Sequence, residues 1–524
     1  MNLAAFLDTA ARRWPDNAAV EWRSATTSYA SFTRRIGSLA AALHEAGLSP
    51  GDRVALLQRN RPELLESLWA CFHGGFVAVP INARLTPAET QALLRNAAVS
   101  AFIGTPEYVE HASALAEKPA AVRIMVGEEQ PLPSGWRAYE DVVASCAPRP
   151  IVTVPPDAGA WLFYTSGTTG QLKGASLSHR NLTAMISHFL ADIDRPGPTD
   201  RILHCAPLTH GSGLYALPAM VRGATQAITA ARSFDPTAIW GSIRDGDVTA
   251  VAFVAPTMLK LLAEEAADER PDEGFRFVVY GGAPMSTSDL RRAVEVFGET
   301  LIQIYGQGEA PMSISTLSGA DHLTGVQTGD DGILMSAGYP YTCGEVAIID
   351  GATGQAVAPG EVGEIATRGD VVMQGYWNNE EATSSALKDG WLRTGDIGFQ
   401  APDGRLTLLD REKDVIISGG SNVYPREVEE LLLAHPGVRE GLVVGAPHER
   451  WGETVVAVLL PEPSWDGDRE QLEADLLRDC ATNLADYKRP RRFEWVDELP
   501  KSAYGKLLRR EIRERYWQGH DRRI

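Results

Sequence analysis

Cysteine and positive charge are both scarce in this sequence. Five cysteines occur among 524 residues, far apart and without a CxxC pair: Cys71, Cys146, Cys205, Cys343 and Cys480. That spacing argues against a zinc site or a disulfide framework, and it fits a reducing compartment. Lysine and arginine total 49 against 68 aspartates and glutamates, which gives a formal net charge of −19. Nucleic acid and anionic membrane surfaces are therefore not expected partners, because both require a positive protein surface.

Long apolar runs and targeting signals are also missing. The longest candidate for a membrane helix, residues 64–81, is interrupted by Glu66, His73 and two glycines. The first residues include Asp8 and lack the apolar core of a signal peptide, and the last four, DRRI, match no retention or peroxisomal signal. We therefore expect a cytoplasmic protein without membrane insertion.

Strand-like runs alternate with amphipathic helical stretches along most of the chain, a pattern typical of α/β folds. The spacing predicts helices at 29–43 and 62–72 and strands at 53–57, 202–205, 248–254, 277–280 and 301–305. From about residue 344, short runs between Gly and Asp turns indicate a β-rich module. Beyond Asp410 the pattern changes to a small α+β unit. The expected architecture is a large N-terminal domain (1–409) of doubly wound α/β sheets plus that module, followed by a small C-terminal domain (410–524).

One segment has the composition of a phosphate-binding loop. An apolar strand runs into TSGTTGQLKG (165–174), which holds three glycines, four hydroxyl residues and Lys173. Glycines let backbone N–H groups converge on an anion, hydroxyls donate further hydrogen bonds, and the lysine supplies charge. An ordinary polar turn does not require several glycines, several hydroxyl groups and a lysine in the same loop. The GxxxxGK[ST] spacing of a Walker loop is absent, so we predict a nucleotide phosphate site of another family.

Five motifs in order resemble those of the adenylate-forming (AMP-binding) superfamily, in its acyl- and aryl-CoA ligase branch. They are TSGTTGQLKG, YGQGE (305–309), WLRTGD (391–396), DREKDVIISGGSNVYPREVE (410–429) and PKSAYGKLLR (500–509). The resemblance covers essentially the whole chain. It implies an enzyme that activates a small carboxylic acid with ATP to an acyl-adenylate, releases pyrophosphate, and then forms a thioester with CoA. ATP, Mg²⁺ and CoA are the implied cofactors.

This chemistry requires cations at the phosphates, a carboxylate for Mg²⁺ and a lysine where charge develops. Glu309 follows a predicted strand and a glycine turn, where α/β proteins bind ligands. The resemblance implies that Glu309 and Thr165 hold Mg²⁺, that Tyr305 stacks on adenine, and that Asp396 and Arg411 hold the ribose hydroxyls. The further nucleotide-binding residues that it implies are Ser166, Gly167, Thr168, Thr169, Gly281, Gly282, Ala283, Gln303, Gly306 and Gly308.

The C-terminal domain is expected to be mobile. Lys506 resembles the lysine that swings in to assist adenylate formation, and it can reach the site only if this domain closes over it. Asp410 resembles the hinge residue. After adenylation, rotation would remove Lys506 and present the loop 418–420, where Gly419 and Gly420 would let the backbone approach the pantetheine arm of CoA.

Two positions depart from the family pattern. Leu172 stands where proline is usual, which should loosen the phosphate loop without removing a ligand. Gly308 stands where threonine is usual, and the missing hydrogen bond to the adenylate phosphate would cost about 0.5–1.5 kcal/mol if nothing replaced it. We consider the neighbouring Gln307 as a replacement donor.

The segment PLTHGSGLYAL (207–217) resembles the one that gates and lines the acyl site. His210 would be the gate and a catalytic residue beside Lys173, Glu309 and Lys506. The remaining implied pocket residues are Gly211, Ser212, Ala216, Phe253, Pro256, Gly281, Gly282 and Met312. No acidic residue occurs between 207 and 217, which argues against an α-amino acid substrate. We expect an aryl or medium-chain acid.

Two alternatives remain. The acyl group could pass to another acceptor, such as a carrier-protein thiol, an amine or another small nucleophile, although the lack of a carrier domain favours CoA. The chain could also be a nucleotide- or acyl-binding sensor without catalysis. The presence of Lys173, Glu309, Asp396, Arg411 and Lys506 argues against a sensor. The natural acid and the oligomeric state, with a homodimer as one option, stay open.

Overall fold

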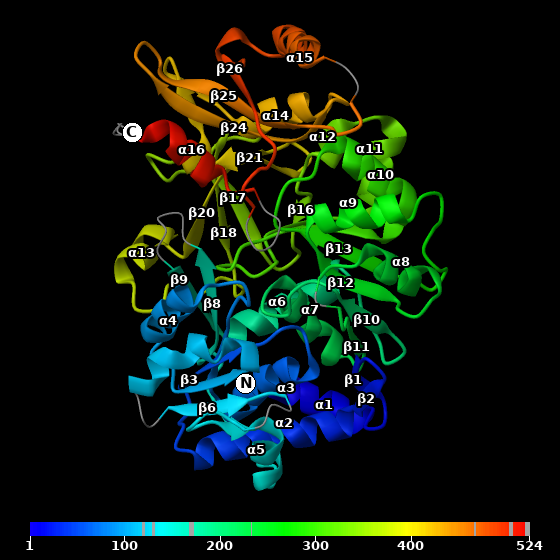
Figure 1. The fold of residues 1–524 in the computed structure, drawn as a ribbon, viewed down its shortest axis with the longest axis vertical. Helices are drawn as coiled ribbons and strands as arrows, with labels where there is room; N and C mark the ends of the chain where they lie inside the picture. Colours follow the sequence, from blue (N-terminus) through cyan, green and yellow to red (C-terminus); the bar gives the residue numbers. More distant parts are fainter. Residues whose placement is uncertain are drawn as a thin grey trace.

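The computed structural model describes residues 1–117, 121–127, 131–166, 172–231, 233–465, 468–501 and 507–518. The N-terminal helices lie at one end of the long axis and the C-terminal strands at the other (Figure 1). The described part of the chain contains four sheets besides its helices, and two of these sheets are large and mainly parallel.

The smaller of the two large sheets has seven strands and carries the predicted phosphate segment at its edge. Its order is β7-β6-β5-β3-β4-β8-β9, in which only β8 and β9 pair antiparallel. Its strands are β3 (Arg53–Leu57), β4 (Val77–Pro80), β5 (Ala101–Gly104), β6 (Val122–Met125), β7 (Arg137–Ala138), β8 (Gly159–Ser166) and β9 (Leu172–Ser178). The β8–β9 pairing places Lys173 opposite Thr165.

The nine-stranded sheet brings the YGQGE motif to its carboxyl edge. Its order is β16-β15-β14-β13-β12-β10-β11-β1-β2, parallel except where β2, β15 and β16 join. Its strands are β1 (Ala18–Trp22), β2 (Ala25–Ser28), β10 (Arg201–His204), β11 (Thr225–Ile228), β12 (Ala250–Val254), β13 (Phe277–Gly281), β14 (Leu301–Tyr305), β15 (Ser315–Leu317) and β16 (Tyr339–Pro340). The carboxyl ends of β13 and β14 therefore lie side by side.

Helices cover these sheets, and local sequence explains where they begin and end. For example, α3 (Pro62–Gly74) starts with a proline in its first turn and ends at Gly75, whose φ of 73° suits a residue without a Cβ. The other helices of this part are α1 (Ala4–Arg13), α2 (Tyr29–Glu45), α4 (Pro87–Asn96), α5 (Tyr139–Ser145), α6 (His179–Asp192), α7 (Gly211–Met220), α8 (Pro236–Arg244), α9 (Pro256–Glu265), α10 (Thr287–Phe297), α11 (Gly319–Thr328), α12 (Asp331–Leu334) and α13 (Glu380–Ala386).

The last two sheets follow the predicted change of character. The β-rich module is a sheet of β17 (Glu345–Ile349), β18 (Gly363–Arg368), β19 (Leu387–Lys388), β20 (Trp391–Gln400) and β21 (Leu406–Arg411). The C-terminal sheet contains β22 (Ile416–Ser418), β23 (Ser421–Val423), β24 (Val438–His448), β25 (Gly452–Pro461) and β26 (Arg492–Trp495), with α14 (Pro425–Leu433), α15 (Arg469–Asn483) and α16 (Arg509–Trp517). The predicted fold class, a large α/β N-terminal domain with a smaller C-terminal α+β domain, is confirmed.

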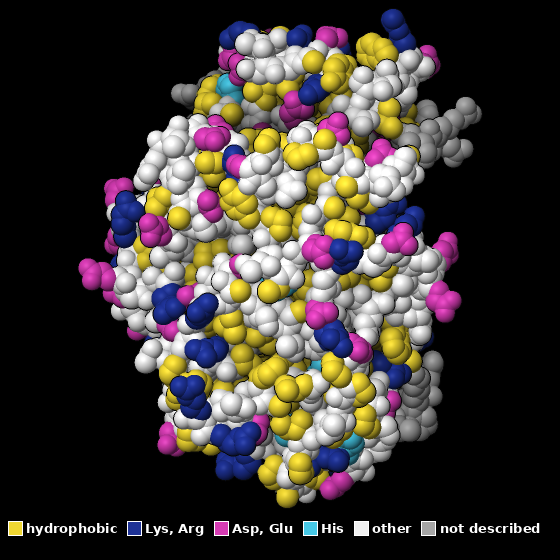
Figure 2. Space-filling model, turned by 180° about the vertical axis from the view of Figure 1, so that it is seen from behind, with side chains coloured by type: hydrophobic (Ala, Val, Ile, Leu, Met, Phe, Trp, Pro, Cys, Tyr) yellow, Lys and Arg dark blue, Asp and Glu magenta, His cyan; other side chains and the backbone are white. Residues whose placement is uncertain are grey.

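The predicted hinge falls at a change of sheet. Asp410 is the penultimate residue of β21, and the C-terminal sheet begins with β22 five residues after Arg411. The boundary itself stays a prediction. Over the described residues, no helix combines the length and apolar character needed to cross a membrane. Charged side chains of both signs are distributed over the face seen in Figure 2, with apolar side chains between them.

Three histidines are fully enclosed in the N-terminal core. His179, His204 and His322 each have no solvent-exposed surface, and burial lowers the pKa of each to about 4. Both ring nitrogens of His204 hydrogen-bond to neutral partners, Nδ1 to Ser212 Oγ at 2.7 Å and Nε2 to Gln226 Oε1 at 2.9 Å. Each ring is therefore neutral in the folded protein at neutral pH.

These histidines predict acid sensitivity. In the unfolded chain each has a pKa near 6.5, so between pH 6.5 and 4 the unfolded state binds more protons than the folded state. The stabilisation is complete above pH 6.5, and the free energy of unfolding should fall by about 2 kcal/mol per histidine by pH 5. Urea denaturation at pH 7.5, 6 and 5 measures this slope. In His322→Gln the free energy of unfolding should fall less between pH 7.5 and 5, by the amount that one histidine contributes. A fall equal to that of the wild type would contradict the assignment.

Candidate active site

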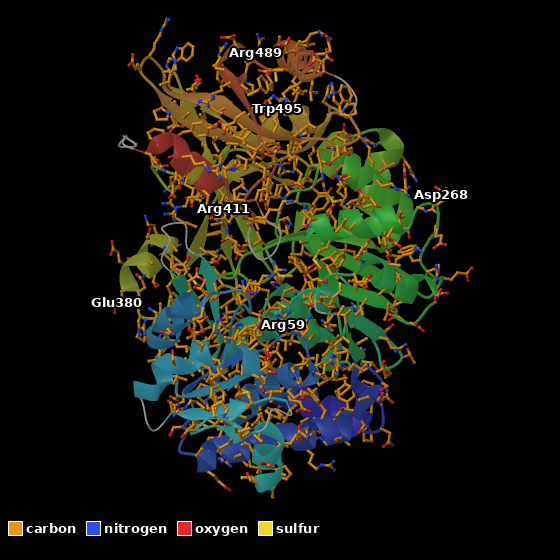
Figure 3. The ribbon with its side chains drawn as sticks, viewed as in Figure 1. Arg59, Asp268, Glu380, Arg411, Arg489 and Trp495 are labelled. Carbon is orange, nitrogen blue, oxygen red and sulfur yellow. The ribbon has the colours of Figure 1, made fainter. Side chains whose placement is uncertain are left out.

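A buried carboxylate gathers side chains from two sheets. Asp396 on β20 is 4% exposed, and its Oδ2 accepts hydrogen bonds from the Tyr305 hydroxyl and from Gln307 Nε2, both at 2.7 Å. Its Oδ1 pairs with Arg411 Nε at 3.0 Å. Asp396 and Arg411 are direct partners in the β20–β21 ladder, which explains why the two motifs meet. Figure 3 shows Arg411 midway along the molecule, between Trp495 of the C-terminal sheet and Arg59.

The charges of this Asp396 cluster are fixed by their surroundings. Burial and the adjacent Asp396 charge raise the pKa of Tyr305 well above its ordinary range, so the phenol is a neutral donor. Asp396 also raises the pKa of Arg411, which stays cationic. A carboxylate offers about four lone-pair positions, and these three partners use three of them. One acceptor position is thus left for a ligand hydroxyl.

A second cluster links Glu309, Tyr376 and Lys173. The Tyr376 hydroxyl donates to Glu309 Oε1 at 2.7 Å, and Lys173 Nζ lies 5.1 Å from the centroid of the Tyr376 ring. The backbone N–H of Met373 donates to the carbonyl of Glu309 at 2.8 Å. The carboxyl end of β14 and the edge strand β9 are therefore held close to each other.

The donor set around Glu309 fits a magnesium–nucleotide complex. The residues with described positions contain no group of three or more His, Cys, Asp and Glu that could hold a metal alone. Mg²⁺ in nucleotide sites usually takes one or two carboxylates and completes its shell with phosphate oxygens and water. A single carboxylate close to a lysine meets that requirement. Thr165, the other implied metal residue, is the penultimate residue of β8, and its side chain is outside what the structure describes.

The candidate acyl site is apolar and uncharged. The His210 ring meets Phe163 edge-on at 5.1 Å, and burial lowers its pKa to about 4, so the ring is neutral. A Cβ on Gly211 would lie 2.9 Å from Met312 Cε and 3.0 Å from Phe253 Cδ1. These side chains therefore occupy the space that the missing Cβ leaves.

Two implied pocket residues on α7 are completely buried. Ser212 is fully buried, and its hydroxyl contacts His204 Nδ1 at 2.7 Å. Ala216, one turn further along α7, is also fully buried in the main core. Because its hydroxyl is engaged by His204, Ser212 adds no free polar group to the pocket, and the wall is less polar than its sequence indicates.

The other implied residues border the two clusters. Gly281 ends β13, Gly282 has φ +83°, and a Cβ on Gly282 would lie 3.7 Å from Phe253 Cζ. Gln303 Oε1 on β14 is buried and has no hydrogen-bond partner among the described residues. The remaining positions are Ala283 after β13, Pro256 at the start of α9, Gly306 and Gly308 on either side of Gln307, and Gly419 and Gly420 between β22 and β23.

The expectation that Gln307 replaces the missing threonine at position 308 is not met in this arrangement. Gln307 Nε2 donates to the carbonyl of Thr394 at 3.0 Å and to Asp396 Oδ2 at 2.7 Å. A primary amide has two N–H donors, and both are used. Gln307 therefore has no proton to offer an adenylate phosphate.

Several predicted residues lie outside the described part of the chain. They are Gly167, Thr168, Thr169 and Lys506, together with the side chains of Thr165, Ser166 and Leu172. Their predicted roles stay predictions.

Sequence reasoning missed Tyr376 and Trp451. Tyr376 belongs to a GYW run that has the composition of an ordinary turn. The backbone N–H of Gly419 donates to the carbonyl of Trp451 at 2.9 Å. The Trp451 ring stacks on the His448 ring, with 4.4 Å between the ring centroids. Arg491 lies 5.5 Å from the centroid of the Trp451 ring. The aromatic residues in HERWGE (448–453), close in sequence to glycines, were the available signal.

A buried ion pair anchors the helix that follows Lys506. Arg509, the first residue of α16, binds both carboxylate oxygens of Glu429, at 2.7 and 3.1 Å. It also donates to the carbonyl of Val443 on β24 at 2.8 Å, and the Val443 N–H donates to Glu429 at 2.6 Å. The backbone three residues beyond Lys506 is thus fixed to the C-terminal sheet.

Removing one partner of this pair should loosen the C-terminal domain. Glu429→Ala leaves the Arg509 charge buried and unpaired, which should destabilise the domain by about 3 kcal/mol. Hydrogen exchange of the β24 amides should then be about 100-fold faster, because 1.4 kcal/mol corresponds to a factor of ten. Glu427→Ala, on the same helix but with a carboxylate 40% exposed, is the control and should change exchange less than about five-fold. Equal effects of the two variants would contradict this role.

Comparison with known proteins agrees with the motifs. The model of the AMP-binding enzyme family matches residues 7–377, and that of the AMP-binding enzyme C-terminal domain matches residues 427–506. Feruloyl-CoA synthase of Amycolatopsis sp. is 38% identical over 97% of both chains. Medium/long-chain-fatty-acid–CoA ligase FadD8 of Mycobacterium tuberculosis is 34% identical over 94% of this chain and 86% of its own.

Solved structures agree as well. The amide bond synthetase McbA from Marinactinospora thermotolerans matches with a TM-score of 0.86 and 31% identity, over 98% of this chain and 100% of its own. Motifs, fold and relatives all point the same way, and this chain belongs to the AMP-binding enzyme family.

Proposed function

We propose that this enzyme is an AMP-forming acyl-CoA synthetase for an aryl or medium-chain carboxylic acid. In the first step a carboxylate oxygen bonds to the α-phosphorus of ATP, the α–β bridging P–O bond breaks, and pyrophosphate leaves. In the second step the CoA thiolate attacks the acyl carbon and AMP leaves. The observation that carries this proposal is the Asp396 cluster beside the Glu309–Tyr376–Lys173 cluster, which supplies an acceptor for a sugar hydroxyl next to groups suited to phosphates.

Different residues are proposed to bind the ribose, the adenine and the phosphates of ATP. Asp396 has one acceptor position for a ribose hydroxyl, and Tyr305 and Arg411 hold that carboxylate in place. The buried Gln303 oxygen is suited to the amino group of adenine. Lys173 places its charge near the phosphates, and Glu309 would hold Mg²⁺, which neutralises phosphate charge when bound.

The acyl site supports an apolar acid. His210 is neutral, Ser212 is engaged internally, and Phe253 and Met312 close the space beside Gly211. A charged substituent would lose its hydration there without gaining a partner. An aromatic ring or a chain of medium length meets no such cost.

We propose that the chain turns at Asp410 to reach a second conformation for thioester formation, in which the contacts of Asp410 and Arg426 would change. Asp410 Oδ2 accepts the backbone N–H of Arg426 at 3.1 Å, and Arg426 Nη1 donates to the carbonyl of Leu408 at 3.1 Å. We assign CoA to the loop of Gly419 and Gly420, whose φ values of 60° and 82° suit glycine and whose lack of a Cβ would let a ligand approach the backbone closely. Trp451 lies against the first of these glycines.

A different acceptor is the second candidate. The similarity to an amide bond synthetase favours an amine in that role.

Mass spectrometry of the products tests the proposal. The enzyme is incubated with a pooled library of carboxylic acids, ATP and Mg²⁺, with and without CoA. We expect acyl-CoA species, only when CoA is present, from aryl or medium-chain acids. Acyl-adenylates that CoA leaves unchanged would instead support the second candidate. Failure to form adenylates from any acid would contradict both.

Asp396→Asn should weaken ATP binding. The amide keeps the size of the side chain but loses the charge that Arg411 pairs with, and in either orientation its N–H group faces a donor, either Arg411 or the Tyr305 and Gln307 pair. Hydrogen bonds to charged groups contribute about 1.5–3 kcal/mol, so the Kd for ATP should rise about 10- to 100-fold. Asp403→Asn is the control, because Asp403 is exposed and its side-chain hydrogen bonds to described residues go to the turn residue Arg405. Calorimetric titration giving the same Kd for both variants would contradict the assignment.

A further inference from the structure

Tyr376 lies between the two charged side chains of the candidate phosphate site. Its hydroxyl donates to Glu309 Oε1 at 2.7 Å, and its ring centroid is 5.1 Å from Lys173 Nζ. A phenol offers an O–H donor at one end and an electron-rich face that attracts a cation. One side chain thus contacts an anion and a cation that are 136 positions apart in sequence, at 173 and 309.

The backbone around Tyr376 is fixed to the strand that carries Lys173. Gln374 N–H donates to the carbonyl of Ser176, and Ser176 N–H donates to that of Gly375, both at 2.9 Å. Trp377 N–H donates to the carbonyl of Gly174 at 2.8 Å, one residue on from the bridge between Ala175 and Tyr376. The segment 374–377 therefore behaves as a short extra strand on β9.

Two further contacts hold the ring and the carboxylate. The Tyr376 N–H donates to Thr383 Oγ1 at 2.9 Å, which ties the segment to α13. The Met373 N–H donates to the Glu309 carbonyl at 2.8 Å. The loop that holds Met373 and Tyr376 therefore hydrogen-bonds both the main chain and the side chain of Glu309. Burial and the adjacent carboxylate raise the pKa of Tyr376, which keeps the hydroxyl a donor.

We propose that Tyr376 is a positioning residue that sets the place of Glu309 and Lys173 before ATP and its divalent cation arrive. This inference rests on the proposed function, since it assigns the site to a metal–nucleotide complex. The hydroxyl occupies Oε1 of Glu309, and no described residue hydrogen-bonds Oε2. That oxygen has both lone pairs left for a cation, whereas Oε1 already accepts the Tyr376 hydroxyl. The ring faces Lys173 and limits the positions that its ammonium group can take.

Two substitutions separate the two contacts. Tyr376→Phe removes the hydroxyl and keeps the ring, whereas Tyr376→Leu removes both. The probes are Mn²⁺ with a non-hydrolysable ATP analogue, followed by electron paramagnetic resonance, and the same analogue without divalent cation, followed by calorimetry. Freeing one side chain costs about 0.5–1.5 kcal/mol, so Tyr376→Phe should raise the Kd for Mn²⁺ about 3- to 10-fold. Its affinity for the metal-free analogue should stay within about two-fold of the wild type.

The leucine variant should weaken both measurements, because Lys173 loses its ring, by about 3-fold or more for the metal-free analogue. High Mg²⁺ should restore the turnover of Tyr376→Phe, whereas a merely structural defect would not be rescued by metal. Tyr339→Phe, an exposed tyrosine on β16, is the matched control and should behave as the wild type.

Two results would overturn the inference. One is an unchanged Kd for Mn²⁺ in Tyr376→Phe. The other is an equal loss of affinity with and without metal, since the hydroxyl would then not act through Glu309. Failure of the proposed function gives a different signature: the wild type itself would bind neither the analogue nor Mn²⁺ in its presence.

Discussion

The geometry of the site depends on one buried carboxylate. Asp396 accepts from Tyr305 and Gln307 and pairs with Arg411, so it joins the end of β14 to both strands of the β20–β21 hairpin. Leaving such a charge buried without partners would cost several kcal/mol. Folding therefore favours this arrangement of the nine-stranded sheet and the β-rich module. A constraint on folding thus also builds the proposed ribose site.

The same constraint connects the site to the predicted hinge. Arg411 directly follows Asp410, whose carboxylate accepts N–H groups from Arg411 and Arg426. A change of backbone conformation at Asp410 would shift the next residue, Arg411, and with it the ion pair on Asp396. The C-terminal sheet has its own anchor for α16 in Glu429 and Arg509, so the proposed movement of this domain would leave α16 in place on the sheet.

Much of this organisation follows from local sequence. Apolar runs fixed in length by Gly and Pro predicted β3 and β14 with their observed bounds, and the motifs brought Glu309, Asp396 and Arg411 into the candidate site. Pairings between distant segments could not be predicted in this way, because they depend on how the sheets meet. Tyr376 is 67 positions from Glu309, and nothing in its own segment indicates that contact. Ser212 and Gln307 have the chemistry of ligand donors, yet neighbours from other strands, His204 and Asp396, take their hydrogen bonds.

The most direct measurement is a crystal structure of the enzyme with ATP and Mg²⁺. We expect a ribose hydroxyl within hydrogen-bond distance of Asp396, with Tyr305 and Arg411 still bound to that carboxylate. We expect the metal on Glu309 while its other oxygen keeps Tyr376. A nucleotide bound elsewhere, or one that replaces Tyr305 and Arg411 at Asp396, would contradict the claim that the fold builds this site in advance.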